Sequence, residues 1–275
     1  LEPSADANRK HPLNPPEHWR KTWLARMKEL IDNYDPELLY FDGAIPFQGE
    51  DEGRTGVEFL AHYYNHSMDL HAGSQQCVMC TKDIPDHAYY IEGAATLDLE
   101  RTKAGEIRSD AWQTDTSIGA WGYHAYRPYR PTMELVHELV DIVSKNGCVM
   151  LNVPPKADGT LDAATERILI EIGEWMDVNG EAIYGTRPWR VAEEEGVRFT
   201  KKGDRVYAIS LAWPGQVGRW AISSLGLGEL GRSIESVRLL GSPAEPEWEQ
   251  LEGAVVVTAP DEAPCRYAYG LEVGF

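Results

Sequence analysis

The stretch Glu37-Leu38-Leu39-Tyr40-Phe41-Asp42-Gly43 decides how the rest of the chain is interpreted. Its apolar and aromatic residues lead without a break into one carboxylate and then a glycine. This pattern is typical of a strand that is buried on both faces in a parallel sheet. Catalytic groups of a βα-barrel lie at the C-terminal ends of its strands, and an unpaired carboxylate inside the barrel wall is costly. We therefore expect Asp42 to open into a cavity; the alternative is that it caps the next element, as Asp often does.

The composition narrows the class of protein. The 275 residues are 25% charged and 43% hydrophobic, which is ordinary for a globular protein. A formal net charge of −18 argues against nucleic acid and against an anionic membrane surface as partners. Nine Trp and 13 Tyr favour a surface that stacks on sugars. The apolar runs are too short to span a bilayer, and no signal peptide is evident.

Helical and strand-like patterns alternate over the first two thirds of the chain. Apolar spacing predicts helices over residues 17–34, 56–70, 132–145 and 163–180, and buried strands over 37–42, 77–80, 94–99 and 148–153. This alternation indicates an α/β fold with a parallel sheet covered by helices. We expect residues 1–188 to form part of a (β/α)8, TIM-like barrel.

The local sequence pattern changes after about residue 188. Short strand-like runs follow one another, separated by Gly, Pro and acidic turns, with no helical pattern between them. That arrangement is typical of an all-β module. We expect residues 189–275 to form a C-terminal β-sandwich domain.

Three motifs resemble cofactor or metal sites, but the residues around each motif do not favour such a site. Residues 226–231 match G-x-G-x-x-G by letter, but a strand-like run follows where a dinucleotide site needs a helix. Cys77 and Cys80 lie three apart on a strand and point to opposite faces, so we expect two buried thiols. His62 and His66 lack the Glu of a hydrolytic H-E-x-x-H site. We expect no cofactor and no metal.

The carboxylates carry more information. Glycoside hydrolysis needs two of them beside the scissile bond, one to attack or activate water and one to protonate the leaving oxygen. Asp42 is one candidate. Glu100 follows the apolar Leu97 to Leu99 run, from which it could enter a cavity lined by Trp112, where burial would keep it protonated. Glu92 and Glu106 remain alternatives for the same role.

Several stretches together resemble the α-L-fucosidases of glycoside hydrolase family 29. The matches run in order through nearly the whole chain: Pro36-Glu37-Leu38-Leu39-Tyr40-Phe41-Asp42-Gly43, Leu97-Asp98-Leu99-Glu100-Arg101, Trp112-Gln113-Thr114-Asp115-Thr116-Ser117-Ile118, Leu151-Asn152-Val153-Pro154-Pro155-Lys156-Ala157-Asp158-Gly159-Thr160 and Asn179-Gly180-Glu181-Ala182-Ile183-Tyr184-Gly185-Thr186. The region after residue 188, with Trp213-Pro214-Gly215, is similar to the β-sandwich of that family.

The resemblance implies an activity and a set of site residues. It implies a retaining exo-α-L-fucosidase that removes terminal fucose from glycans without a cofactor, with Asp42 as the nucleophile and Glu100 as the acid/base. Tyr40 takes the place of an aromatic residue that touches the fucose, and Lys82 that of a basic residue at the end of the next strand. Trp112 is expected to line the same cavity.

One departure from the family is large. Family members carry an N-terminal half-barrel whose residues bind the fucose hydroxyls, whereas here Asp42 comes almost at once. The chain therefore resembles the C-terminal part of a fucosidase, to be completed by an N-terminal half-barrel or by a second copy. The family implies a secreted, periplasmic or lysosomal location. The alternatives are a non-catalytic carbohydrate-binding protein and a transfucosidase.

Overall fold

The structure, a computed structural model, describes residues 14–42, 45, 49–82, 93–215 and 218–275. The chain forms two compact units. Unit 1 comprises Leu1–Glu100 with Asp110–Gln113, and unit 2 comprises Arg101–Ser109 with Thr114–Phe275. Among the described residues, no helix is both long and apolar enough to cross a membrane.

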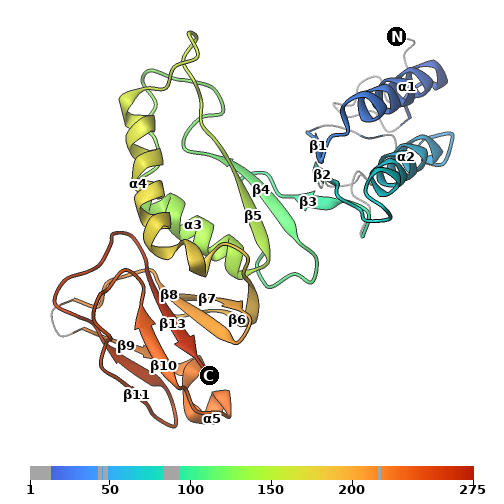
Figure 1. Cartoon of the computed structure of the whole chain (residues 1–275). Helices are drawn as coiled ribbons and strands as arrows, with labels where there is room; N and C mark the ends of the chain where they lie inside the picture. The colour runs from blue at the N-terminus through green and yellow to red at the C-terminus, as the bar shows by residue number, and fades with distance from the viewer. Residues whose placement is uncertain (1–13, 43–44, 46–48, 83–92, 216–217) are drawn as a thin grey trace. The chain divides into compact units, whose positions relative to one another are not determined.

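Unit 1 consists of parallel strands with two helices. Its elements are α1 (Glu17–Tyr34), β1 (Leu38–Phe41), α2 (Arg54–Leu70), β2 (Val78–Lys82), β3 (Thr96–Asp98) and the first residues of β4 (Trp112–Ser117) (Figure 1). The pairs β1–β2, β2–β3 and β3–β4 are all parallel. Parallel pairing aligns the C-terminal ends of these strands along one edge of the sheet, which is where a barrel enzyme holds its reactive groups.

The two faces of this sheet differ in their cover. Leu39, Phe41 and Met79 pack against apolar side chains of α1 and α2. Successive strand residues point to opposite faces. Leu38 and Val78 therefore lie on the other face, where their side chains are 50% and 40% exposed. Among the described residues of unit 1, the helices cover one face of the sheet. The other face, the open face, exposes Leu38 and Val78 but buries Cys80 and Asp98, which are 3% and 1% exposed.

Unit 2 continues the strand–helix alternation and adds the β-sandwich. Its helices are α3 (Thr132–Ser144), α4 (Ala163–Asn179) and the short α5 (Leu227–Leu230), with 3-10 turns at Gly180–Ala182 and Ser223–Leu225. Its strands, beyond the end of β4, are β5 (Gly147–Asn152), β6 (Arg187–Glu194), β7 (Val197–Lys202), β8 (Arg205–Ser210), β9 (Arg219–Ile222), β10 (Ser236–Leu239), β11 (Trp248–Gln250), β12 (Val255–Thr258) and β13 (Tyr269–Gly274).

The strands fall into three sheets. The first has the order β1-β2-β3-β4-β5, and the other two have the orders β10-β13-β8-β7-β6 and β11-β12-β9. Five strands are more than half of an eight-stranded barrel. The two antiparallel sheets enclose a common apolar core that includes Phe199, Leu271, Trp220 and Val257. Together these features are a partial barrel followed by a sandwich.

Strand β8 explains why the sandwich and the last helices form one unit. Val206 and Ala208 face the sandwich core, whereas Tyr207 and Ile209 pack with residues of α3 and α4 such as Trp175. Figure 1 shows α3 and α4 beside the sheet that contains β6, β7 and β8. Because β8 is buried on both faces, the helix layer and the sandwich share it.

Two strands differ from the sequence expectation. Residues 112–115 have no apolar periodicity, yet β4 runs from Trp112 to Ser117, because its polar side chains form hydrogen bonds to neighbouring segments. Residues 187–194 contain Pro188 and several charges, yet they form β6 with a register shift between Pro188 and Glu193. β6 lies at the edge of its sheet, where proline is tolerated.

Candidate active site

Three charged side chains meet at the C-terminal ends of β1, β2 and β3. Asp42 directly follows β1, Lys82 is the last residue of β2, and Glu100 lies two residues beyond β3. The Nζ atom of Lys82 lies 3.2 Å from Oδ1 of Asp42 and 2.8 Å from Oε2 of Glu100. The structure therefore brings together the two carboxylates and the lysine that the sequence singled out.

Strand register explains why these side chains share a face. Lys82 and Asp98 are register partners, and Glu100 lies two residues beyond Asp98. Asp42 lies two residues beyond Tyr40, whose partner is on β2. Residues two apart on a strand point the same way. All of these positions consequently lie on the open face of the sheet, opposite the helices.

The exposure of the three groups is uneven. The side chain of Lys82 is 9% exposed, whereas those of Asp42 and Glu100 are 76% and 46% exposed. The expectation that Glu100 would be enclosed in a cavity lined by Trp112 is not met by the described residues.

The two carboxylates lie close to one another. Oδ1 of Asp42 and Oε2 of Glu100 both contact the Lys82 nitrogen, at 3.2 Å and 2.8 Å. These two oxygens are therefore at most about 6 Å apart. One ammonium group between two carboxylates leaves a formal charge of −1. Lys82 is almost buried, but solvent reaches both carboxylates and partly screens their attraction to the ammonium group.

The structure does not bring Trp112 to this site. Trp112 is fully buried and is the register partner of Leu97, so it lies on the face that the helices cover. The next residue, Gln113, is the partner of Asp98 and donates from Nε2 to Oδ2 of Asp98 at 2.5 Å. Sequence reasoning missed Gln113 as a neighbour of the site. The alternation of faces along an assigned β4 would have indicated it.

The sequence left alternatives for the acid/base residue and for the role of Asp42. Glu92 lies outside the described residues. Glu106 belongs to unit 2, where it lines a hollow with Lys145 and Glu193. The interpretation of Asp42 as a cap for the next helix is wrong, because α2 begins at Arg54 and the backbone N–H of Thr55 donates to Asp51.

The motifs set aside in the sequence have structural roles. Cys77 and Cys80 are buried thiols, as expected. Nε2 of His62 lies 2.7 Å from Oδ1 of Asp32, which ties α2 to α1. Within the described part of the chain, no group of three or more His, Cys, Asp or Glu side chains could hold a metal ion. Residues 226–231 contain only the four-residue helix α5, and strand β10 is the next element, so the motif does not open the helix that a dinucleotide site needs.

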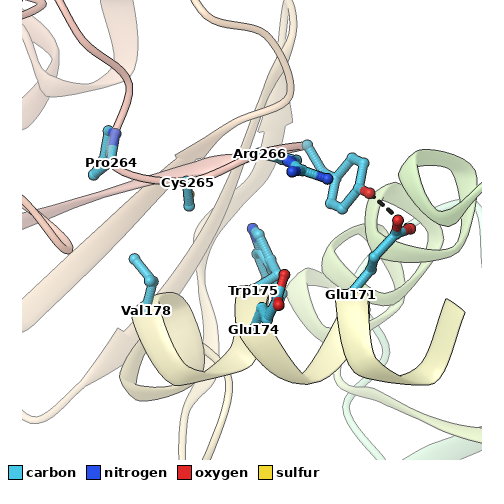
Figure 2. Close-up of a pocket in the computed structure, with 8 residues that line it drawn as sticks. Glu171, Glu174, Trp175, Val178, Pro264, Cys265 and Arg266 are labelled. Atoms are coloured by element: carbon cyan, nitrogen blue, oxygen red, sulfur yellow. Dashed lines mark hydrogen bonds between the residues drawn. The ribbon is translucent and has the colours of Figure 1, made fainter. Parts of the chain in front are cut away.

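A second hollow lies in unit 2, between α4 and the segment before β13. It has a volume of about 270 Å³ and is lined by Glu171, Glu174, Trp175, Val178, Pro264, Cys265, Arg266 and Tyr267. The hydroxyl of Tyr267 donates to Oε2 of Glu171 at 2.9 Å. Figure 2 shows Glu171 and Val178 on helix α4, with Pro264 and Cys265 on the segment opposite. The indole N–H of Trp175 donates to the carbonyl of Ala268 at 2.8 Å. These two hydrogen bonds hold α4 against the segment before β13, so the residues that form them have a structural role.

The sequence matches the models of two known protein families. A family model described as Alpha-L-fucosidase matches residues 2–181, and one described as Alpha-L-fucosidase C-terminal domain matches residues 192–274. The chain belongs to the α-L-fucosidase family. It is thus a member of a family of glycoside hydrolases, as the sequence predicted.

Individual relatives agree with this family. The plasma α-L-fucosidases of Pongo abelii and Homo sapiens are each 31% identical over 265 residues, which are 90% of this chain and 54% of theirs. An α-L-fucosidase of Branchiostoma floridae is 29% identical over 260 residues, 90% of this chain and 55% of its own length. The chain spans about half the length of the curated relatives it matches.

Solved structures support the fold. A Thermotoga maritima α-fucosidase in complex with a mechanism-based inhibitor is similar with a TM-score of 0.75 at 23% identity, over 98% of this chain and 60% of that one. α-L-Fucosidase isoenzyme 1 from Paenibacillus thiaminolyticus gives a TM-score of 0.71 at 24% identity, over 98% and 65% of the two chains. The predicted fold, a partial barrel followed by a β-sandwich, is confirmed.

Proposed function

We propose that this protein is a retaining exo-α-L-fucosidase in which Asp42 is the nucleophile and Glu100 is the acid/base. The observation that carries the proposal is the pair of contacts from Lys82 to both carboxylates. Retaining glycosidases hold their two carboxyl groups about 5–5.5 Å apart, and inverting enzymes about 6.5–9.5 Å apart. A separation of at most about 6 Å between the measured oxygens favours the retaining arrangement.

The reaction then proceeds in two displacements. Asp42 attacks the anomeric carbon while the carboxylic acid of Glu100 protonates the leaving oxygen, so that a fucosyl ester forms on Asp42 and the alcohol departs. Glu100, now a carboxylate, removes a proton from water, and the water oxygen displaces Asp42 from the anomeric carbon. Each displacement inverts the anomeric carbon once, so after two displacements fucose leaves with the configuration of the substrate.

Lys82 gives the pair a third member. Its ammonium group offsets the negative charge of Asp42 before the first displacement and that of the Glu100 carboxylate after it. Its position at the end of β2 also lets it donate a hydrogen bond to a sugar hydroxyl. Tyr40 lies on the same face, two residues before Asp42, and is proposed to pack against the fucose ring.

The remainder of the fucose pocket would have to cover the open face of this sheet. Among the described strands, β1 lies at the edge of its sheet with β2 as its neighbour. We propose that a further half-barrel segment, from the same gene product or from a second chain, continues the sheet beyond β1. A fucosylated glycan is the proposed substrate of the completed site.

Kinetics of the complete gene product test this assignment. Asp42→Ala should abolish turnover of 4-nitrophenyl α-L-fucoside, whereas Asp69→Ala, an exposed carboxylate on α2, should leave it unchanged. Retention of activity within tenfold in Asp42→Ala would show that another group is the nucleophile. Azide should rescue Glu100→Ala with this activated leaving group. Rescue of Glu106→Ala instead would reassign the acid/base.

The two alternative functions, a carbohydrate-binding protein and a transfucosidase, predict different results in activity measurements. Binding of fucosides by the wild-type protein without hydrolysis after long incubation would favour a non-catalytic carbohydrate-binding protein. Transfer of fucose to an added sugar acceptor, in preference to water, would favour a transfucosidase. Release of free fucose as the main product supports the hydrolase.

A further inference from the structure

Unit 1 contains a buried carboxylate that the two displacements do not use. Asp98 is the last residue of β3, is 1% exposed, and lies on the open face two residues before Glu100. Burying an ionised carboxylate is costly unless hydrogen bonds and a cation compensate for the lost water. The neighbours of Asp98 on the same face therefore indicate what its charge does.

One neighbour, Gln113 of β4, orients this carboxylate. Nε2 of Gln113 donates to Oδ2 of Asp98 at 2.5 Å, and the two residues are register partners. The backbone N–H of Leu99 donates to the carbonyl of Gln113 at 2.9 Å, which joins the two strands beside this pair. Because an amide carries no charge, this contact orients Asp98 but does not neutralise it.

The other neighbour, Lys82 of β2, supplies a positive charge. Lys82 and Asp98 are register partners, so their side chains leave the same face from strands about 4.8 Å apart. Both residues are buried, at 7% and 1% exposed. Solvent therefore screens this pair less than it screens the attraction of Lys82 to the more exposed Asp42 and Glu100.

The proposed reaction moves a negative charge from one side of Lys82 to the other. Before the first displacement Asp42 is the carboxylate, whereas in the fucosyl ester Glu100 carries the charge. Lys82 contacts both groups, at 3.2 Å and 2.8 Å. An ammonium group attracted by these two alone would shift toward whichever is charged. A third carboxylate, whose charge does not change during the reaction, would hold it between them.

We propose that Asp98 is a positioning residue, which holds the ammonium group of Lys82 between the two reacting carboxylates during both displacements. This inference rests on the proposed function. The amide of Gln113 keeps Asp98 in the orientation that this role requires. Because Asp98 is buried, it acts on the reaction through Lys82. Its effect on turnover should therefore disappear when Lys82 is replaced.

A double-mutant cycle in the complete gene product tests this dependence. Asp98→Asn keeps the shape of the side chain and removes its charge, and we expect kcat for 4-nitrophenyl α-L-fucoside to fall by about tenfold while KM changes by less than about threefold. In the Lys82→Met background, the same substitution should change kcat by less than about threefold. Asp141→Asn removes a buried carboxylate of unit 2 and is the control, which should lower the Tm but leave kcat unchanged.

Exchanging the charged and the neutral group provides a second, independent test. Asp98→Asn combined with Gln113→Glu keeps one carboxylate, one amide and both side-chain lengths, and we expect kcat within about threefold of the wild type. This variant also decides the question if Asp98→Asn alone does not fold. A loss of about tenfold in the exchanged pair would overturn the inference.

The outcomes separate this inference from the proposed function. An equal loss of kcat from Asp98→Asn in both backgrounds, or no loss in either, would overturn it and leave Asp98 with a structural role at most. Hydrolysis by the wild-type protein that depends on Asp42 preserves the proposed function in these cases. A wild-type protein that does not hydrolyse the fucoside would overturn the proposed function and, with it, this inference.

Discussion

The ammonium group of Lys82 lies 3.2 Å from the Oδ1 atom of Asp42, although the two residues end different strands and a whole helix separates them in the sequence. The same nitrogen lies 2.8 Å from Glu100. A parallel sheet makes this meeting possible, because its strands all finish at one edge. The account of function depends on that shared contact.

The first prediction removes the charge of Lys82. Lys82→Met keeps most of the side-chain length but leaves two carboxylates without their common cation, and we expect kcat/KM for an aryl fucoside to fall by about 10²-fold. Lys82→Arg keeps the charge and should lose less. Lys28→Met removes another lysine–glutamate pair of unit 1, between Lys28 and Glu58, and should have no effect on turnover. A Lys82→Met enzyme as active as the wild type would contradict the role given to this residue.

The second prediction concerns the pH dependence of stability. Burial alone would raise the pKa of Asp141, but hydrogen bonds from Lys103, Arg198 and Lys145 outweigh it and lower that pKa from 3.8 to about 2. A depressed native pKa stabilises the fold above the unfolded pKa, so this stabilisation is present above about pH 4 and is lost as the pH falls toward 2. Its size is about 2 kcal/mol.

Urea unfolding at pH 7 and pH 2.5 measures this effect. We expect Asp141→Asn to lower the free energy of unfolding at pH 7 by about 3 kcal/mol, because three cationic side chains lose their buried partner. The variant should also lose less stability than the wild type on acidification. Asp204→Asn, an exposed carboxylate in the turn between β7 and β8, is the control. Parallel pH profiles of wild type and Asp141→Asn would rule out this contribution.

The third prediction concerns the C-x-x-C motif. Cys148 is exposed, whereas Cys77 and Cys80 are 8% and 3% exposed, and burial raises the pKa of Cys265. Ellman's reagent should therefore modify Cys148 rapidly in the native protein and Cys77 and Cys80 only after unfolding. Cys148→Ser should remove the fast phase. Rapid labelling of Cys77 or Cys80 that added Zn²⁺ suppresses would instead support a metal site.

The sequence was sufficient for elements with a strong apolar pattern. The run before Asp42 predicted β1 and the strand end that carries the carboxylate, and the apolar spacing of residues 17–34 predicted α1. It was not sufficient for β4, whose buried Thr114, Thr116 and Ser117 are polar. Such residues form a strand because tertiary hydrogen bonds satisfy them, and those bonds have no signature in a local pattern.

The candidate site was predictable in part for the same reason. A carboxylate at a strand end is visible in the sequence, so Asp42 and Glu100 could be named. The faces of Trp112 and Gln113 depend on the register between β3 and β4, which sequence spacing alone does not give.

The most direct test of the central claim is to trap the intermediate. The complete gene product should be incubated with 2-deoxy-2-fluoro-α-L-fucosyl fluoride, which slows both displacements and allows the fucosyl ester to accumulate, and then digested at low pH for peptide mass spectrometry. We expect one label, on the carboxylate of Asp42, and none in Asp42→Ala. A label on a different carboxylate, or an active enzyme that releases fucose of inverted configuration, would contradict the account.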